Sequence, residues 1–412
     1  MALIVQKFGG TSVGSIDKIM NVARRVVATH EGGNEVVVVV SAMAGETDRL
    51  LGLADAITKR PSERELDQLV STGEQVSIAL LAMAIESLGH QARSFLAHQI
   101  CIRTDNRFSR ASILSIDPAA ILDRLGERKI AVVAGFQGTD AEGNVTTLGR
   151  GGSDTTAVAI AAALAADVCE IYTDVDGVFT TDPNLCPEAR KLDRISHDEM
   201  LELASLGAKV LHIRAVAFAK KFGVPLHVRS SYHDKPGTWV VAEDTCMESA
   251  PITGVTYVKN EMRIRVLGVP DRPTATRDLI VPLGRAGLRV DTIVQNASVD
   301  GFFDLSFTLP KVEAEQAREL AEHAADELGA IGVEVEGPVA KVSVIGVGMR
   351  TDLQVPARVF ETLAAHDIPI QMVATSEIKL SVIIDEAHLE EAVRALHAAF
   401  ELHKDADDCE EV

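Results

Sequence analysis

Short apolar runs alternate with longer stretches of helical periodicity in the first half of the chain. Four runs predict buried strands, at residues 2–6, 36–40, 130–134 and 168–173. The five consecutive valines at 36–40 are typical of a strand covered on both faces. Residues 15–29 instead place apolar side chains at helical spacing, and residues 157–166 are apolar all round, as in a buried helix. The alternation predicts a mostly parallel sheet between two helical layers.

Each predicted strand ends in a loop of small and polar residues. Ligands of open α/β sheets bind beyond the carboxyl ends of the strands, so we expect these loops to form a site. The most distinctive loop has Gly149, Gly151 and Gly152 before Ser153, which we expect to cap a buried helix, with Arg150 and Asp154 on either side. Such a helix start is suited to an anion. A tight turn that merely uses glycines is the alternative.

The second half of the chain contains an internal repeat. Val266-Leu267-Gly268-Val269 recurs as Val344-Ile345-Gly346-Val347, and residues 290–294 recur at 369–373. Each copy has the pattern strand, helix, strand, strand, helix, which predicts two copies of a small α+β module. We expect a catalytic domain at 1–245 and modules at 262–338 and 339–412, with residues 246–262 contributing a strand if the modules interleave.

Composition narrows the classes of partner. The 412 residues are 47% hydrophobic and carry a formal net charge of −20, which argues against nucleic acid or an anionic membrane as a partner. The five cysteines show neither CxxC nor Cys/His spacing, so no disulfide framework or zinc site is indicated. The first apolar run is too short for a signal peptide or a membrane span. We therefore expect a soluble, cytoplasmic protein.

Two residues combine candidate chemistry with a plain structural alternative. Lys7 precedes Gly9 and Gly10, where it would act as a point charge over phosphates bound by glycine N–H groups. An exposed lysine that begins a turn is the alternative. Glu74 ends Ser71-Thr72-Gly73-Glu74, whose spacing favours a capping box. Its functional alternative is a carboxylate that receives a substrate ammonium. Neither GxxxxGK[ST] nor GxGxxG occurs, so hydride transfer has no support.

Six segments, in the same order, resemble those of aspartate kinases, and the repeat resembles a pair of ACT domains. The segments are Lys7-Phe8-Gly9-Gly10-Thr11-Ser12, residues 36–41, Ser71-Thr72-Gly73-Glu74, residues 147–154, residues 172–178 and residues 207–212. The resemblance covers nearly the whole chain. It implies an amino acid kinase fold, a three-layer α/β/α structure around a mostly parallel sheet, followed by two βαββαβ ACT modules. It also implies phosphorylation of the β-carboxylate of L-aspartate by ATP with Mg2+, the first step toward lysine, threonine, methionine and isoleucine.

The resemblance also implies roles for individual residues. Catalysis would involve Lys7, Asp154 and Lys209. The nucleotide would contact Lys7, Gly9, Gly10, Thr173, Asp174, Phe179, Asp182, Pro183 and Lys209. Aspartate would contact Ser41, Thr47, Glu74, Arg150, Gly152 and Ser153, with Arg150 on its α-carboxylate and Glu74 on its ammonium. The effectors lysine and/or threonine would contact Asp291, Gln295, Asn296, Thr375 and Ser376. No residue is assigned as a metal ligand.

Several alternatives stay open at this level. The family's glycine after the first strand of each ACT module is missing, at residues 271–274 and at 351–354, so effector binding and the identity of the effector are undecided. A homodimer or larger oligomer through the ACT modules is expected. Met247 is a possible start of a separate regulatory chain. The alternative functions are another enzyme of the fold, such as acetylglutamate, glutamate 5- or uridylate kinase, and an inactive amino-acid sensor.

Overall fold

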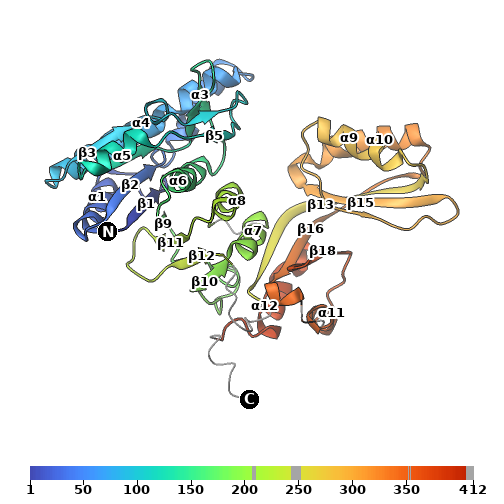
Figure 1. Cartoon of the computed structure of the whole chain (residues 1–412). Coiled ribbons are helices and arrows are strands. Elements are labelled where there is room, and N and C mark those ends of the chain that lie inside the picture. Colours follow the sequence, from blue (N-terminus) through green and yellow to red (C-terminus); the bar gives the residue numbers. More distant parts are fainter. Residues whose placement is uncertain (207–209, 243–251, 351, 353, 405–412) are drawn as a thin grey trace. The chain divides into compact units, whose positions relative to one another are not determined.

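The computed structural model describes residues 1–412 except 207–209, 243–251, 351, 353 and 405–412 (Figure 1). The chain forms two compact units. The first comprises Met1–Val178, Lys191–Ser205 and Lys209–Cys246, and the second comprises Phe179–Arg190, Leu206–Ala208 and Met247–Val412. Residues 179–190, inside the range predicted for the catalytic domain, thus pack with the second unit. Met247 lies outside the described residues.

The first unit is built on an eight-stranded sheet. Its strands, in spatial order, are β10 (Arg194–Ser196), β12 (Thr238–Val241), β11 (Leu226–Ser230), β9 (Val168–Thr173), β1 (Leu3–Phe8), β2 (Glu35–Val40), β6 (Ile130–Ala134) and β3 (Ala92–Phe95). All neighbours are parallel except β11 and β12. The mostly parallel sheet predicted from the apolar runs is confirmed, and the valines of β2 are fully buried because both faces of the sheet are covered.

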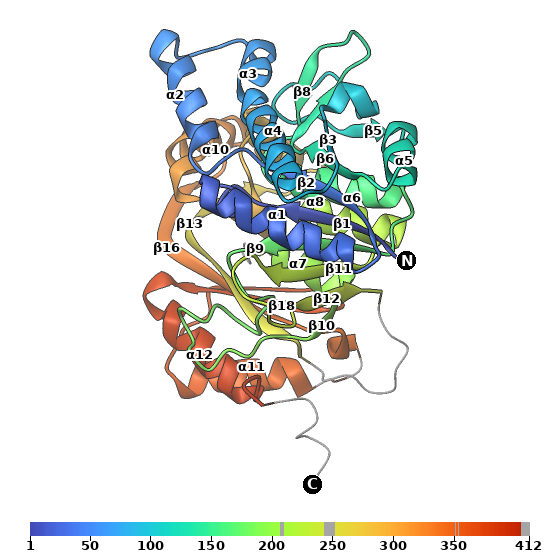
Figure 2. The ribbon, with the colours of Figure 1, turned by 90° about the vertical axis from the view of Figure 1, so that its left-hand side faces the viewer.

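Helices cover the two faces of this sheet. On one face α1 (Ile16–Glu31) and α4 (Thr72–Ser87) share a hydrophobic core with β1, β2 and β6, and Figure 2 shows α1 crossing in front of β1 and β2. On the other face α6 (Gly152–Ala163) contacts β1, β2 and β9 and packs against α8 (Ile213–Phe222), which in turn contacts α7 (His197–Ser205). The α6 side chains from Thr155 to Ala161 are all buried, as the all-apolar pattern predicts.

The remaining elements of the first unit lie around β6, α4 and a small sheet. They are the helices α2 (Glu46–Ile57), α3 (Glu63–Val70), α5 (Ala119–Gly126) and η1 (Ala97–Ile100), and the small sheet itself, in the order β5 (Ile113–Ser115), β4 (Arg103–Thr104), β7 (Gln137–Thr139), β8 (Val145–Thr147). Helix α5 packs on β6, and α3 contacts both α4 and β8. The helical stretch Glu63–Ser87 is long and apolar enough to cross a membrane by length and composition. However, 56% of its most apolar window is buried, as in the core helix of a globular protein.

The second unit is built on a six-stranded antiparallel sheet. Its order is β14 (Asp291–Gln295), β15 (Phe302–Pro310), β13 (Gly254–Pro270), β16 (Gly332–Ile345), β18 (Lys379–Asp385) and β17 (Met372–Thr375). Helices α9 (Ala275–Arg285) and α10 (Ala314–Leu328) form one core, and α11 (Gln354–Ala365) and α12 (Leu389–Ala399) form another. Both repeats therefore fold as α+β modules on one continuous sheet.

The two long strands of this sheet serve both cores. Val255, near the start of β13, packs in the core of α11 and α12, whereas Ile264 and Val266 of the same strand pack in the core of α9 and α10. In β16 the pattern is reversed, because Val333 packs against the α9–α10 core and Val342 lies in the α11–α12 core. The α9–α10 core is thus built entirely from the first repeat, whereas the α11–α12 core is completed by the start of β13, which precedes that repeat.

Candidate active site

The carboxyl ends of four parallel strands lie in register. Phe8, the last residue of β1, is paired with Val40 of β2 on one side and with Tyr172 of β9 on the other, and Val40 is paired with Ala134 of β6. The loops that follow these strands therefore leave the sheet side by side. Most of the candidate residues named from the sequence lie in these loops, and the strand register brings them to one edge of the sheet.

Lys7 and Asp154 form an ion pair at this edge. The Lys7 Nζ lies 2.6 Å from Asp154 Oδ1, and the two side chains are 12% and 14% exposed. Lys7 points from β1 toward the α6 face, and Asp154 lies in the first turn of α6. A Cβ atom added to Gly9 would lie 3.4 Å from Lys7 Nζ, so the ammonium group lies beside the glycine loop. The pairing of a cation with that loop is a suitable arrangement for phosphate.

The loops after β1 and β2 touch directly. A Cβ atom at Gly10 would lie 2.8 Å from the carbonyl oxygen of Ala42, and the Ala44 N–H donates to the Gly10 carbonyl at 3.1 Å. A side chain at Gly10 would therefore push the loops apart. Ser41 begins the β2 loop, and Thr47 lies in the first turn of α2, which that loop enters.

Glu74 is a buried carboxylate with one unpaired oxygen. Its side chain contacts the β2 loop, where Oε1 accepts a 2.9 Å hydrogen bond from the Ala42 N–H. Oε2 has no hydrogen-bond partner in the described part of the chain, and the residue is 3% exposed. Burial raises the pKa of Glu74 to about 7. The capping-box interpretation is wrong: Ser71 makes no side-chain cap bond and donates its hydroxyl to Gln68 O instead.

The start of α6 differs in detail from the sequence prediction. Gly151 is the N-cap, at φ 67°, and Ser153 lies in the first turn without a capping bond, so its predicted role as N-cap is wrong. Tertiary packing explains the difference, because a Cβ atom at Gly135 would lie 2.7 Å from Ser153 Oγ. Gly152 is held equally closely between Phe136 and Leu148. Arg150 is exposed and makes no ion pair with the described residues.

His212, the last residue of the resembling segment 207–212, packs against this turn. A Cβ atom at Gly151 would overlap the His212 ring, and Nδ1 accepts from the Arg214 N–H at the start of α8. Burial lowers the pKa of His212, although the negative charge of Asp154 opposes that shift. The imidazole is therefore a neutral packing group at neutral pH. Its place in segment 207–212, which resembles the aspartate kinases, was the only sequence signal that could have identified it.

The residues predicted to bind the nucleotide are divided between the two units. Thr173 and Asp174 follow β9, where the Thr173 carbonyl accepts from the Ser231 N–H at 2.8 Å. Phe179, Asp182 and Pro183 belong to the second unit, and Asp182 Oδ2 there accepts from the Tyr257 hydroxyl at 3.0 Å. Lys209 lies outside the described residues.

The predicted effector residues fall on opposite edges of the second unit's sheet. Asp291, Gln295 and Asn296 lie on or next to β14, whereas Thr375 ends β17 and Ser376 follows it. The two strands nevertheless share a small apolar cluster, in which Val294 of β14 packs with Met372 of β17. Asp291 is ion-paired with Lys341, and Gln295 Oε1 accepts from the Thr276 hydroxyl at 2.9 Å. Asn296 donates its N–H to Asp304 O.

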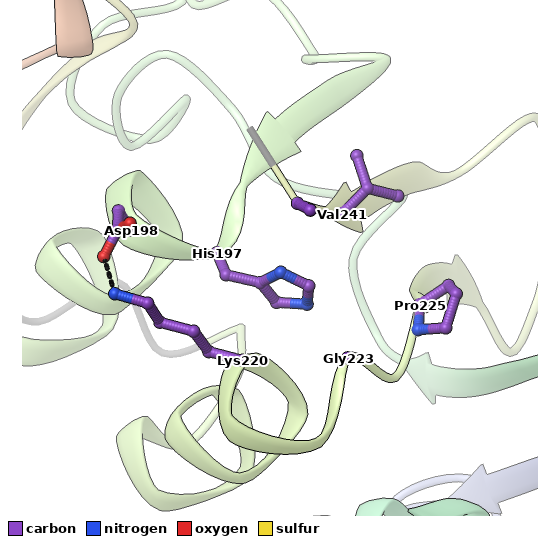
Figure 3. A pocket seen from close by; sticks show the side chains of 7 residues that line it. His197, Asp198, Lys220, Gly223, Pro225 and Val241 are labelled. Carbon is purple, nitrogen blue, oxygen red and sulfur yellow. Dashed lines mark hydrogen bonds and ion pairs between the residues drawn. The ribbon is translucent and has the colours of Figure 1, made fainter. Parts of the chain in front are cut away.

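A cavity of about 370 Å³ lies elsewhere in the first unit (Figure 3). His197, Asp198 and Lys220 line it, together with Pro225, which directly precedes β11. Since β11 runs parallel to β9, the cavity lies at the amino edge of the sheet, opposite the loops that carry Lys7 and Gly9. Asp198 and Lys220 are ion-paired across it, and His197 Nε2 lies 3.2 Å from Val224 O. The cavity is thus separate from the candidate active site.

Comparison with known proteins identifies the class. The amino acid kinase family model matches residues 2–230, and an ACT domain model matches residues 342–400. The chain therefore belongs to the amino acid kinase family. It is 52% identical over 404 residues to an aspartokinase of Pseudomonas aeruginosa, with 98% of each chain covered. It is also 49% identical over 408 residues to an aspartokinase of Thermus thermophilus, with 98% of this chain and 100% of the relative covered.

A solved structure agrees with this placement. The crystal structure of E. coli aspartokinase III in complex with aspartate and ADP matches with a TM-score of 0.79 and 28% identity, covering 96% of this chain and 99% of that one. Within the family, the chain is thus one of the aspartate kinases, phosphotransferases whose acceptor is a carboxyl group.

Proposed function

We propose that the protein transfers the γ-phosphoryl group of ATP to the β-carboxylate of L-aspartate and forms 4-phospho-L-aspartate. The observation that carries this proposal is the Lys7–Asp154 ion pair beside Gly9, at the same sheet edge as the half-satisfied Glu74 carboxylate. One part of the site offers positive charge and backbone N–H groups for phosphate. The other offers a buried carboxylate for an ammonium group.

At the phosphate end, Lys7 neutralises charge on the transferring phosphoryl group while Asp154 orients the lysine. Gly9 and Gly10 supply N–H donors to phosphate oxygens, and Thr173 and Asp174 border the nucleotide. A substrate carboxylate is already a nucleophile, so this chemistry needs positioning and charge neutralisation rather than a strong base. The roles of Lys209, Phe179, Asp182 and Pro183 stay predictions from the resemblance.

At the substrate end, Arg150 binds the α-carboxylate and Glu74 binds the ammonium of aspartate. Arg150 is suited to this role because it is exposed and free of ion pairs with the described residues. Ser41, Thr47 and Ser153 donate further hydrogen bonds, and Gly152 admits the substrate close to the backbone. An N-acetylated amino acid would leave Glu74 buried without a partner, at a cost of about 1–3 kcal/mol, so the site selects a zwitterion.

In this proposal ATP would arrive together with Mg2+, which would supply charge neutralisation at the phosphates. No group of three or more His, Cys, Asp or Glu side chains in the described part of the chain could hold a metal ion by itself. A Mg2+ ion that arrives with a nucleotide takes most of its ligands from phosphates and water.

Lysine and/or threonine regulate the enzyme by feedback through the ACT modules in this proposal. The candidate effector residues lie on the edge strands β14 and β17, and unpaired strand edges are the parts of a sheet that pair with another chain. A homodimer or larger oligomer would therefore form along these edges. The E. coli relative has been crystallised with lysine and aspartate, at a TM-score of 0.77 and 28% identity. The product would enter the synthesis of lysine, threonine, methionine and isoleucine.

The test is ATP- and Mg2+-dependent acyl phosphate formation, trapped with hydroxylamine. Aspartate, glutamate and acetylglutamate are compared, each with and without lysine and threonine. We expect turnover with aspartate alone and its suppression by an effector. Unchanged turnover at saturating lysine plus threonine would contradict the regulatory part only. Turnover with acetylglutamate or glutamate would reassign the substrate, and no turnover with any of them would favour an amino-acid sensor.

A further inference from the structure

A second buried carboxylate, Asp67 on α3, ties together segments that are distant in sequence. Asp67 is 0% exposed. Its oxygens accept from the Ser109 N–H at 3.0 and 2.9 Å and from the Ser109 hydroxyl at 3.2 Å. They also accept from the Thr147 N–H and the Thr147 hydroxyl, each at 2.7 Å. A buried carboxylate with this many donors is well satisfied and holds its partners rigidly.

The donors of Asp67 lead directly to Arg150. Thr147 ends β8 three residues before the arginine, and its carbonyl accepts from the Ala111 N–H at 2.8 Å. A Cβ atom at Gly149, whose φ is +75°, would lie 2.9 Å from the Ser109 carbonyl oxygen. The loop that carries Arg150 therefore packs against the segment around Ser109. Asp67 is hydrogen-bonded both to that segment and to Thr147, which leads into the loop.

On its other side Asp67 is connected to Glu74. Helix α3 ends at Val70, and α4, which carries Glu74, begins at Thr72. The junction is itself anchored, because Gln137 Nε2 donates to the Ser71 carbonyl at 3.1 Å. Few rotatable bonds therefore separate the Asp67 backbone from the Glu74 backbone. One carboxylate thus links the helices that carry Glu74 to the loop that carries Arg150.

We propose that Asp67 is a positioning residue for aspartate recognition, which holds the Arg150 loop at a fixed distance from Glu74. The inference rests on the proposed roles of Arg150 and Glu74. The ammonium and α-carboxylate of an amino acid share one carbon atom, so the two protein groups that bind them must be held at a matching separation. Asp67 touches neither substrate nor nucleotide and acts through Thr147 and Ser109.

The test is Asp67→Asn, an isosteric change that removes the charge and sets an NH2 group against N–H donors. We expect the KM for aspartate to rise at least tenfold, with the KM for ATP within twofold and kcat lowered less than threefold. The matched control is Asp140→Asn in the β7–β8 turn. Asp140 is also nearly buried and accepts from the N–H groups of Glu142 and Asn144, but it bonds to neither Ser109 nor Thr147. Its constants should stay within twofold of the parent.

A double-mutant cycle with Arg150→Ala separates this inference from the proposed function. If Asp67 acts through Arg150, adding Asp67→Asn to Arg150→Ala should raise the KM for aspartate less than twofold further. Full additivity, or an equal rise in the KM for ATP, would overturn the inference. An effect of Arg150→Ala without an effect of Asp67→Asn would overturn only the role of Asp67. If Arg150→Ala itself leaves the aspartate KM unchanged, the proposed function of Arg150 fails instead.

Thr147→Val provides a second variant for the case in which Asp67→Asn does not fold. It removes one hydroxyl donor to Asp67 and preserves the shape of a side chain that is 2% exposed. We expect a two- to fivefold rise in the aspartate KM and an unchanged KM for ATP. An aspartate KM equal to that of the parent protein would contradict the inference.

Discussion

Replacing Glu74 with glutamine should change both stability and substrate binding, in opposite directions. The pKa of Glu74 is raised from 4.5 to about 7 by burial. Between those two values the folded state binds more protons than the unfolded state, so the free energy of unfolding falls as pH rises through this window. At about 1.4 kcal/mol per pKa unit, the ionised carboxylate costs the ligand-free protein about 3 kcal/mol above pH 7.

Glutamine carries no charge and can still accept the Ala42 N–H bond with its Oε1. We therefore expect Glu74→Gln to be more stable than the parent above pH 7, by up to about 3 kcal/mol, and the difference to vanish as pH approaches 4.5. Urea unfolding at pH 5, 6, 7 and 8 measures this. The single tryptophan, Trp239 on β12, reports the unfolding of the first unit by fluorescence.

The same substitution should also change the KM for aspartate. An ammonium group binds the ionised carboxylate, so the KM of the parent protein for aspartate should rise about tenfold per pH unit below pH 7. In Glu74→Gln the KM should be high and nearly independent of pH. Asp48→Asn, an exposed carboxylate of α2, is the control and should follow the parent in both assays. A stability difference between Glu74→Gln and the parent that is the same at pH 5 and pH 8 would refute the reasoning.

Four further variants test the remaining parts of the site. Lys7→Ala and Asp154→Ala should each lower kcat by roughly 10²–10⁴-fold with little change in the unfolding midpoint, and near-normal rates in a coupled ADP assay would remove the pair from the mechanism. Arg150→Ala should raise the KM for aspartate and leave that for ATP unchanged; an effect confined to ATP would contradict its assignment. Gly151→Ala should destabilise the first unit by more than about 2 kcal/mol in urea unfolding, because a Cβ atom there overlaps His212 at positive φ, and parent-like stability would show that the turn relaxes freely.

The central sheet could be predicted from sequence because its strands are buried on both faces. Continuous apolarity at residues 36–40 has no competing explanation, and β6 and β9 have the bounds that the apolar runs indicate. Lys7, Gly9 and Asp154 could be associated in advance only through motif resemblance. Their proximity depends on register between distant strands, which no local pattern encodes.

The errors arose where tertiary contacts replace local ones. The spacing of Ser71 and Glu74 satisfies a capping box, yet Glu74 turns to the β2 loop and bonds to Ala42. Ser153 suits an N-cap, but its hydroxyl packs against Gly135. Asp67 was not a candidate, because an aspartate in an amphipathic helix gives no sign that its partners lie 42 and 80 residues away.

The long strand β13 means that, for the second module, the stretch of chain that is repeated in the sequence is shorter than the stretch that folds around its core. A cut between the repeats, near residue 338, would fall inside β16; it would leave the whole α9–α10 core on one side but separate the α11–α12 core from Ile252 and Val255. The second repeat expressed alone would therefore lack part of its own core, and because both cores share β13 and β16 the two should melt in one transition rather than two. A displacement in one core can also be transmitted to the other along the backbone of a shared strand, rather than across an interface that could slide.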